Sequence, residues 1–304
     1  MSQSVVGKGN DPMQEKASTL LFEFLSMQVS ENNAICPQGD QRYEVTRGRN
    51  HFINISSNLS HGTCFKPREI ISDIQMHQFM KTFHYNTNEA NISFIDVFIE
   101  NPPIEISKIV FRKEDNVKYS KDYFRWRNKN QSDLETLRQH IVAKNISFSS
   151  QLETEYLGIL QALNNTVNLQ TKENESDLDQ NKIDFGLLEN YIRWLKYWYN
   201  LSGTTNNTER FIRFLYSDYI KLMPIHRIEA NLTAKILTRK APIKSGDAMD
   251  IDHISSILPY ADYLFTDKSM KHLIKALKLD SLFECTVFYL GDAEEFISGF
   301  NRAK

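Results

Sequence analysis

The spacing of apolar residues predicts a helix and a short strand near the beginning of the chain. An Asp-Pro pair at positions 11–12 has the order of an N-cap and a first helical residue, and apolar residues between 20 and 25 then recur at helical spacing. The apolar run 34–36 is closed by Pro37, which predicts a brief buried strand. A turn and a second helix through Glu44 are expected to follow.

The middle of the chain, from about residue 85 to residue 225, has helical periodicity but no recognisable motif. Apolar spacing predicts helices over 134–142, 152–163 and 183–198, and the polar segment 171–182 predicts a surface loop. An aromatic stripe in the last helix is compatible with stacking on nucleotides, although buried packing is the favoured interpretation. The stripe consists of Tyr191, Trp194, Leu195, Trp198 and Tyr199.

The pattern is sharpest from residue 225 onward. Apolar residues predict one helix over about 228–237 and another over 251–258, which ends before Pro259. A short apolar run at 263–265, a further helix and a strand at 286–290 follow. Strand, helix and strand in this order predict parallel pairing with helices on the faces of the sheet, and therefore an α/β fold.

Composition and charge exclude several classes of protein. The 304 residues are 41% hydrophobic and 24% charged, which is typical of a folded soluble protein. The 36 Lys and Arg nearly balance the 38 Asp and Glu, so a nucleic-acid surface would have to be a local patch. No apolar stretch approaches the roughly 20 residues of a membrane-spanning helix, and the polar start has no signal sequence. We therefore expect a cytoplasmic protein without a membrane segment.

Two acids near the C-terminus indicate a metal site. Asp267 directly follows the run 263–265, and Asp250 lies in the first turn of the preceding helix. Since the carboxyl ends of parallel strands open into a crevice, these two side chains are expected to converge there. Clustered carboxylates are tolerated chiefly when a cation neutralises them, and oxygen ligands suit Mg²⁺ or Mn²⁺. Widely spaced cysteines indicate neither a zinc site nor a disulfide framework: Cys36, Cys64 and Cys285.

The same C-terminal segment resembles a known nuclease family. Residues 244–270, KSGDAMDIDHISSILPYADYLFTDKSM, look like the C-terminal half of a PIN-domain nuclease, in which an acid opens a helix and a later strand ends in Thr-Asp. The Asp-x-x-His, Leu-Pro-Tyr-x-Asp and Thr-Asp elements are similar to a bacterial PIN-like branch. Upstream, residues 34–45, AICPQGDQRYEV, resemble the second strand and helix of the family. The resemblance covers about 225–304 well and about 15–60 weakly.

The resemblance implies a PIN-like parallel sheet flanked by helices, interrupted by a large helical insertion. Residues 1–84 would form the N-terminal part of the α/β core, 85–224 the helix-rich insertion, and 225–304 the C-terminal part of the core. PIN domains open with a strand that ends in a metal-binding Asp. Here residues 4–6 are followed by no such acid, and Asp11 fits a helix cap better, so the metal site would have one acid fewer.

The resemblance also implies the residues of the site. The acids that would hold Mg²⁺ or Mn²⁺ are Glu44, Asp247, Asp250 and Asp267, and all except Asp247 would be catalytic. A metal-activated water would attack the phosphodiester in line. Other residues would support the acids: Thr266, His253 and Asp262. Cations beside the acids would bind phosphates without reading sequence: Arg42, Arg47, Lys244 and Lys268.

Each of these residues also has a structural interpretation. Asp247 and Asp250 can cap a helix and complement its dipole, and Asp267 can be a solvated turn residue. His253 is better suited to orienting a neighbouring carboxylate or to packing in the wall than to binding metal. The remaining positions can be an exposed helical acid (Glu44), a turn residue (Asp262) and ordinary solvated cations.

The sequence therefore predicts a metal-dependent endonuclease that hydrolyses phosphodiester bonds, with RNA as the expected substrate. One alternative is a catalytically inactive PIN-like module that binds RNA or a protein partner, which the absent first-strand acid and the near-neutral charge favour. A different phosphohydrolase on a parallel sheet is another. A protein inhibitor and a homo-oligomer are both compatible with the sequence.

Overall fold

The computed structural model describes residues 12–39, 57–99, 110–112, 121–158, 185–204, 207–244 and 246–300. For 110–112, 121–130 and 185–190 it describes the backbone alone. The chain forms two compact units. Unit 1 consists of Met1–Arg68, Ser93–Leu137 and Ala241–Lys304, and unit 2 consists of Glu69–Ile92 and Arg138–Lys240.

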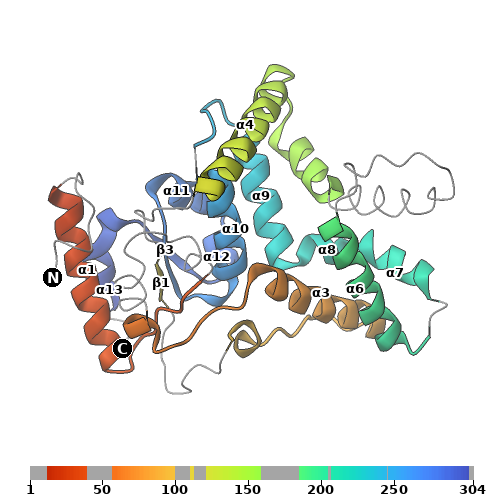
Figure 1. Ribbon diagram of the computed structural model, residues 1–304, viewed down its shortest axis with the longest axis horizontal. Coiled ribbons are helices and arrows are strands. Elements are labelled where there is room, and N and C mark those ends of the chain that lie inside the picture. Colours follow the sequence, from red (N-terminus) through yellow and green to blue (C-terminus); the bar gives the residue numbers. More distant parts are fainter. Residues whose placement is uncertain are drawn as a thin grey trace. The chain divides into compact units, whose positions relative to one another are not determined.

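Helices account for most of the described residues (Figure 1). The elements of unit 1 are α1 (Pro12–Ser30), η3 (Phe94–Val97), β1 (Val110–Arg112), α10 (Asp247–Ile257), η5 (Leu258–Tyr260), β2 (Tyr263–Phe265), α11 (Lys268–Ala276), α12 (Leu279–Leu282), β3 (Thr286–Phe288), η6 (Leu290–Asp292) and α13 (Ala293–Phe300). Those of unit 2 are α3 (Arg68–Tyr85, whose first residue belongs to unit 1), α6 (Phe185–Ser202), α7 (Thr208–Leu215), α8 (Asp218–Leu222) and α9 (Pro224–Thr238). Helix α4 (Lys121–Ala143) begins in unit 1 and ends in unit 2. Among these helices none combines the length and apolar composition needed to cross a membrane.

The strands of unit 1 form one small parallel sheet in the described part of the chain. The order is β1-β2-β3, and Tyr263 of β2 lies between Val110 of β1 and Thr286 of β3. Two further backbone bonds extend the pairing of β2 with β3: Thr286 N donates to Asp262 O at 2.8 Å, and Thr266 N donates to Phe288 O at 2.9 Å. Polar residue Thr266 is therefore fixed at the carboxyl end of β2.

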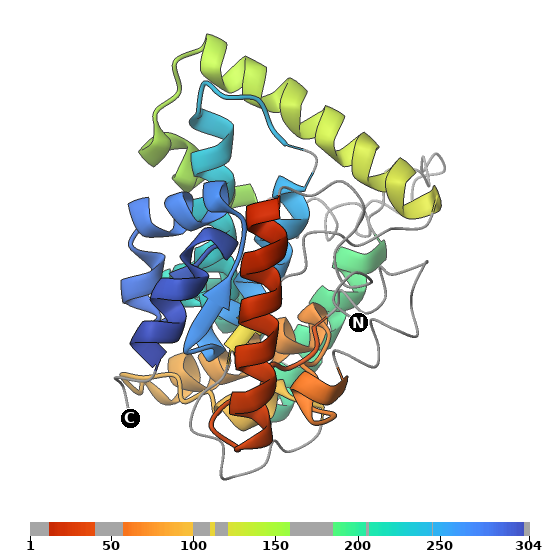
Figure 2. The same ribbon diagram turned by 90° about the vertical axis from the view of Figure 1, so that its left-hand side faces the viewer.

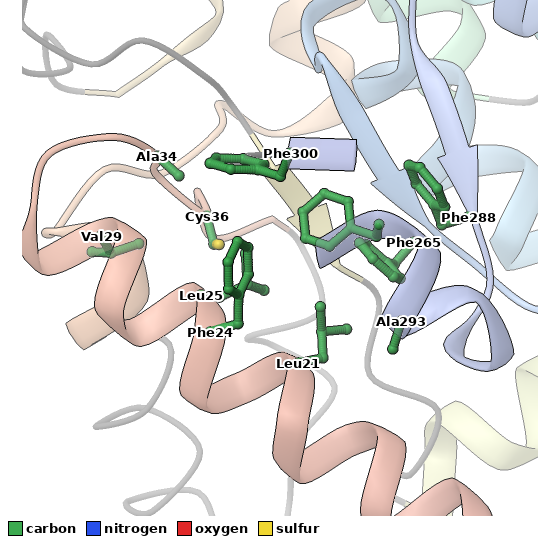
Figure 3. Packing of buried hydrophobic residues seen from close by; sticks show 11 residues of the cluster. Leu21, Phe24, Leu25, Val29, Ala34, Cys36, Phe265, Phe288, Ala293 and Phe300 are labelled. Atoms are coloured by element: carbon green, nitrogen blue, oxygen red, sulfur yellow. The ribbon is translucent and has the colours of Figure 1, made fainter. Parts of the chain in front are cut away.

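Helix α1 packs its apolar face against the sheet and α13. Leu21, Phe24 and Leu25 lie on this face and are buried, and Figure 3 shows them on the side of α1 that faces Phe265 and Phe300. The helix ends in a Schellman arrangement, because Asn32 adopts a left-handed φ of 58° and Asn33 N donates to Gln28 O at 2.8 Å. The 3.6-residue periodicity of α1 thus buries one side of the helix in the core of unit 1.

Aromatic rings dominate the core of unit 1. The ring of Phe296 from α13 meets that of Phe265 from β2 edge-on, with centroids 5.0 Å apart, and it also meets the ring of Phe24 from α1 edge-on at 5.9 Å. Phe296 is 1% exposed, so it is enclosed by rings from the sheet and from both helices. Edge-to-face contacts of this kind add a favourable electrostatic term to the hydrophobic burial.

Unit 2 has a separate core, made by helices alone. The indole of Trp198 on α6 is fully buried and stacks near Phe211 and Phe214 of α7, with ring centroids 5.8 and 6.1 Å away. Its Nε1 donates to Asn207 O at 3.0 Å, so the one polar atom of the ring is satisfied. The aromatic stripe of 191–199 is therefore core packing in large part, as favoured from the sequence.

Polar side chains tie the helices of unit 2 together. Asp73 of α3 is buried, and its Oδ2 lies 2.6 Å from Arg193 Nε of α6, while its Oδ1 accepts from Trp194 Nε1 at 2.8 Å. Gln75, also on α3, accepts the backbone N–H of Ile225 through Oε1 at 2.9 Å. Because Pro224 begins α9, this bond satisfies one of the amide groups that the first turn leaves without a helical partner.

The α/β fold predicted from the sequence, a PIN-like parallel sheet flanked by helices with a large helical insertion, is wrong. The described residues are mostly helical, and their sheet has three strands of three residues each. The local pattern predicted parallel strands at 263–265 and 286–290; their pairing confirms the parallel arrangement, although the second strand ends at Phe288. The error has a physical cause: a short apolar run identifies a strand but does not specify how many further strands complete its sheet.

Other expectations have mixed outcomes. Helices α1, α9, α10 and α11 confirm the predicted helical segments around 12–25, 228–237, 251–258 and 270–277. The predicted strand at 34–36 is not a regular strand: only Ile35 within it is a bridge residue, and an isolated bridge between Gln38 and Cys64 follows. Asp11, the second helix through Glu44 and the predicted loop 171–182 lie outside the described residues. The division at 84 and 224 stays a prediction.

Candidate functional site

Two aspartates are buried on the first turn of α10. Asp247 is the first residue of the helix and Asp250 follows three residues later, with exposed fractions of 3% and 6%. Positions i and i+3 lie on the same side of a helix, so the two carboxylates share one face. A Cβ added to Gly246 would lie 3.9 Å from Asp250 Oδ2, which places this carboxylate next to the glycine that precedes the helix.

The local sequence favours acids at this place. The first turn of a helix carries partial positive charge and backbone N–H groups without helical partners, both of which stabilise carboxylates. Asp247 Oδ2 accepts from the backbone N of Lys244 at 2.9 Å, and Asp250 N donates to Gly246 O at 2.9 Å. The sequence expectation that Asp247 plays a structural role at a helix start is therefore consistent with its geometry.

Helix α4 anchors the segment that leads into α10. Glu135 Oε2 accepts from the backbone N of Ile243 at 2.9 Å, and Gln131 Nε2 donates to Ile243 O at 3.2 Å. The side chain of Ile243 is itself buried. Both backbone groups of one residue are thereby held by side chains more than 100 positions earlier, which fixes where the first turn of α10 begins.

The carboxyl end of β2 carries the second group of candidate residues. Thr266 is 5% exposed, and its Oγ1 is buried with no hydrogen-bond partner among the described residues. Asp267 is the N-cap of α11: its Oδ1 accepts from Ser269 N at 2.6 Å and from Met270 N at 3.0 Å. Oδ2 takes part in neither bond. Asp267 is thus a helix cap rather than the solvated turn residue of the structural interpretation.

The other two of the three supporting residues proposed from the sequence, His253 and Asp262, lie in different environments. His253 is buried on α10, one turn after Asp250. Asp262 is exposed at the amino end of β2, whereas Asp267 follows the carboxyl end. Five extended residues span about 16 Å, so Asp262 is separated from the site at the carboxyl end. Its turn position agrees with the structural interpretation.

The negative charge of Asp262 affects the pKa of the Cys285 thiol. Burial raises the pKa of the Cys285 thiol, and the negative charges of Asp262 and Asp280 raise the pKa further. Since the thiolate is the reactive form, Cys285 is held as an unreactive thiol at neutral pH. Cys36, Cys64 and Cys285 are all buried, and none of the three is in a disulfide.

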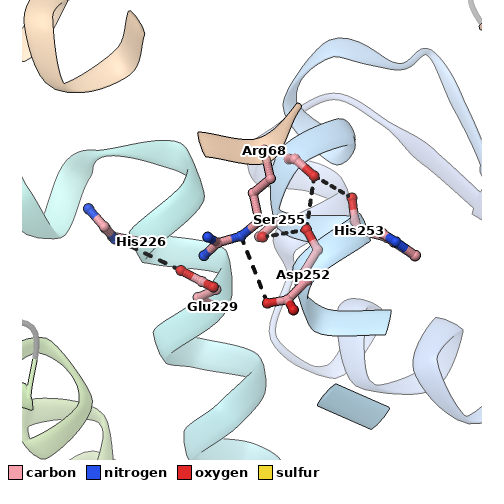
Figure 4. Close-up of polar contacts among 7 residues, drawn as sticks. Arg68, His226, Glu229, Asp252, His253 and Ser255 are labelled. Carbon is pink, nitrogen blue, oxygen red and sulfur yellow. Dashed lines mark hydrogen bonds and ion pairs between the residues drawn. The ribbon is translucent and has the colours of Figure 1, made fainter. Parts of the chain in front are cut away.

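A neighbouring acid on α10 has an ordinary role. Asp252 Oδ1 lies 3.8 Å from Arg68 Nε, and its backbone O accepts from Ser255 Oγ and Ser256 Oγ at 2.9 Å each (Figure 4). Its carboxylate side chain is 44% exposed, unlike those of Asp247 and Asp250. The same figure shows, within unit 2, the pair of His226 Nδ1 and Glu229 Oε2, 3.9 Å apart.

Cations proposed to bind phosphate are only partly described. Lys244 and Lys268 are exposed, and Lys268 Nζ lies over the ring of Tyr289, 5.6 Å from its centroid. Arg42, Arg47 and the catalytic candidate Glu44 lie outside the described residues. Lys244 precedes Asp247 by three residues, so one phosphate-binding candidate adjoins the buried acids.

Sequence reasoning missed an ion pair near the carboxyl end of β3. Lys271 Nζ of α11 lies 2.5 Å from Asp292 Oδ2, and that oxygen also accepts from Tyr289 N at 2.9 Å. Both side chains are mostly buried, and Lys271 lies over the rings of Phe288 and Tyr289. Only one of these bonds is local: Asp292, three residues after Tyr289, accepts the Tyr289 amide as an N3 acid does, whereas the pairing with Lys271 joins positions 21 residues apart.

In the described part of the chain, the predicted metal ligands do not form one group. Within the described ranges, no three His, Cys, Asp or Glu side chains form a group that could hold a metal ion. Asp247 and Asp250 share a turn, whereas Asp267 is engaged at the start of α11. The remaining proposed ligand, Glu44, lies outside the described residues. Comparison of the chain with protein-family models, with curated proteins and with solved structures finds no match.

Proposed function

We propose that the chain is a metal-dependent endonuclease that acts on RNA, with Asp247 and Asp250 as the centre of its ion site. The observation that carries the proposal is the burial of two carboxylates, three residues apart, on the first turn of α10. Burying one carboxylate is costly, and two on one face repel each other, so a cation between them would stabilise both.

The type and number of donors suit a hard divalent ion. Carboxylate oxygens are the ligands that Mg²⁺ and Mn²⁺ prefer. Mg²⁺ commonly keeps several waters and binds through one or two carboxylates and the phosphates of the substrate. Two carboxylates are therefore enough protein ligands for a Mg²⁺ site. When bound, such an ion polarises a phosphodiester and lowers the pKa of a coordinated water.

The remaining roles fall to residues of the chain itself. Asp247 and Asp250 hold the ion from α10, and the anchoring of Ile243 by α4 keeps that first turn in place. Exposed Lys244 and Lys268 are suited to phosphate oxygens, which supply affinity without sequence selectivity. Glu44 remains a proposed additional ligand. An RNA substrate is compatible with the cytoplasmic location expected from the sequence, and a protein inhibitor would act by covering the acids.

A second candidate is a non-catalytic module that binds RNA or a protein partner. One observation favours it: two of the proposed ligands have structural uses, because Asp267 caps α11 and Asp247 accepts the amide of Lys244. In this case the acids stabilise helix starts, and any ligand would bind through surface groups.

Metal binding separates these candidates. Millimolar Mn²⁺ is expected to raise the melting temperature of the full chain, since a ligand at about one hundred times its Kd adds about 2.7 kcal/mol to the free energy of unfolding. Asp250→Asn should abolish the increase. Asp252→Asn is the matched control, because it makes the same change on the same helix at a half-exposed carboxylate.

Cleavage of an end-labelled, unstructured RNA tests the activity. We expect Mn²⁺-dependent cleavage that EDTA stops and that Asp250→Asn lowers by about 100-fold or more, with Asp252→Asn unaffected. Cleavage that persists in EDTA or in the Asp247→Asn, Asp250→Asn double variant would refute the proposal. RNA binding without any stabilisation by Mn²⁺ would support the non-catalytic module instead.

A further inference from the structure

Helix α1 has an exposed apolar stripe beside its buried face. Met13, Leu20 and Met27 are 79%, 37% and 47% exposed, although large apolar side chains are usually buried. They recur every seven residues, and seven residues are nearly two helical turns, so the three side chains form one line along the helix. Figure 2 shows the whole length of α1, in red, on which this line runs.

Two opposite charges complete the stripe. Lys16 and Glu23 are exposed and lie three residues after Met13 and Leu20, respectively. The five positions thus alternate spacings of three and four residues, which is the spacing of the contact seam between paired helices. Single exposed apolar residues are ordinary, but five positions in seam register along a helix of 19 residues form a continuous surface.

The order of residues in the stripe is self-complementary. Met13 and Met27 are equally distant from Leu20, and Lys16 and Glu23 lie on opposite sides of it. If a second α1 packs antiparallel about a twofold axis at Leu20, then Leu20 meets the partner subunit's Leu20 and Met13 meets the partner subunit's Met27. Lys16 then lies within one residue of the level of the partner subunit's Glu23, about 1.5 Å along the helix axis, and the symmetry makes this contact twice.

We propose that this stripe of α1 is a homodimer interface, which binds a second copy of the chain in antiparallel orientation. Charge complementarity selects both the partner and the direction. A parallel pair would place Lys16 against the partner subunit's Lys16 and Glu23 against the partner subunit's Glu23, and like charges at close range repel. The interface lies beside the face of α1 that packs in the core and uses none of its buried residues, so dimerisation leaves the core of unit 1 intact.

Sedimentation equilibrium of the full chain over a range of concentrations measures the association. We expect a concentration-dependent dimer, which Leu20→Glu abolishes because two carboxylates would meet at the axis. Lys16→Glu and Glu23→Lys should each weaken the dimer roughly tenfold, since each reverses two ion pairs. The double variant Lys16→Glu, Glu23→Lys should restore it.

Control variants guard against effects on folding. Leu282→Glu alters a side chain of similar exposure on α12 and should leave the dimer unchanged. Restoration by the double exchange also shows that the single variants fold. A chain that is monomeric at every concentration, or a double exchange that fails to restore the dimer, would overturn the proposal.

Cysteine cross-linking tests the direction of the helices. Leu20→Cys should form a disulfide between subunits on mild oxidation. Met13→Cys should not, because two copies of position 13 would lie about 21 Å apart along the antiparallel pair. A mixture of Met13→Cys and Met27→Cys chains should cross-link, and the native cysteines are buried and should not interfere. Cross-linking of Met13→Cys with itself would contradict the antiparallel arrangement.

Discussion

Units 1 and 2 both bury aspartates, but they hold them in different ways. In unit 2, Asp73 of α3 is bound by Arg193 and by the Trp194 indole of α6, about 120 positions later in the sequence. In unit 1, Asp247 accepts an amide only three residues away, from Lys244. The first arrangement connects two helices, whereas the second closes a local turn. Asp73 is therefore explained by the assembly of its unit.

The hydrophobic cores of the two units also differ in the elements that form them. The core of unit 1 gathers side chains from strands and helices, with Phe296 at its centre, whereas that of unit 2 is purely helical, with Trp198 at its centre. The sheet of unit 1 is short, and its carboxyl end leaves polar groups such as Thr266 Oγ1 buried without a hydrogen-bond partner in the described part of the chain. The helical unit also buries such an atom, His84 Nδ1 of α3, so this property is not confined to strand ends.

The largest expected effect comes from removing the central ring of either core. Phe296→Ala and Trp198→Ala should each lower the free energy of unfolding by about 3–5 kcal/mol, because each leaves a cavity at a fully buried position. Urea unfolding followed by circular dichroism measures the loss. If the units fold independently, each variant should shift a different part of the transition. A single transition, shifted equally by both, would instead show that the units unfold together.

Asp73→Ala should have the next largest effect. It leaves the Trp194 N–H and the Arg193 guanidinium without their partner, and because Arg193 is 32% exposed we expect a loss of about 2–3 kcal/mol rather than the full penalty of a buried pair. Asp218→Ala, at a carboxylate that is 89% exposed, is the control and should change stability little. If the two changes had equal effects, the ion pair of Asp73 with Arg193 and its hydrogen bond from Trp194 would not stabilise unit 2.

Asp267 allows a smaller and more selective test in unit 1. Asp267→Ala removes the cap of α11 and should lower stability by about 1 kcal/mol, whereas Asp267→Asn keeps an acceptor oxygen and should lower it much less. If Asp267 is a cap alone, Asp267→Asn will retain RNA cleavage and stabilisation by Mn²⁺. If Asp267 also binds the ion, Asp267→Asn will lose both while remaining as stable as the unchanged chain without metal.

The smallest effect is a dependence of stability on pH in unit 2. Burial, and then the charge of Lys81, lower the pKa of His77 below its ordinary 6.5, and burial lowers the pKa of His84 as well. The unfolded chain therefore binds these protons first, so the free energy of unfolding should fall as the pH drops below about 6.5. His77→Gln should reduce this dependence between pH 7.5 and 5.5, as measured by urea midpoints. Unchanged midpoints in the parent chain would contradict it.

Local parts of both units could be predicted from the sequence. The apolar spacing of α1 and the apolar runs of β2 and β3 are local features, and the predicted helix and the parallel pairing of the two strands are confirmed. The position of Asp250 in a first helical turn is another local feature. The capping role of Asp267 had a local signal too, since an aspartate directly before a helix is a preferred N-cap.

The fold class and the neighbours of each acid could not be predicted in the same way. The interpretation of the C-terminal motif as one end of a larger α/β sheet failed because the apolar runs do not encode what lies beside them. The bonds of Gln131 and Glu135 to Ile243 join positions more than 100 residues apart, and the periodicity of the sequence does not predict them. The acids of the candidate site could thus be located from the sequence, but the side chains that hold the segment before α10 could not.

By itself, the sequence determined several helices, the strands β2 and β3, the apolar face of α1, and the position of Asp250 in the first turn of a helix. These features follow from steric preferences, capping and burial over a few residues. The tertiary structure alone decided that the chain is mostly helical, that Asp73 is bound by Arg193, and that the stripe of α1 stays exposed while its neighbouring face is buried. Those outcomes depend on which distant surfaces meet, because burial and ion pairing are properties of the folded neighbourhood rather than of the residue.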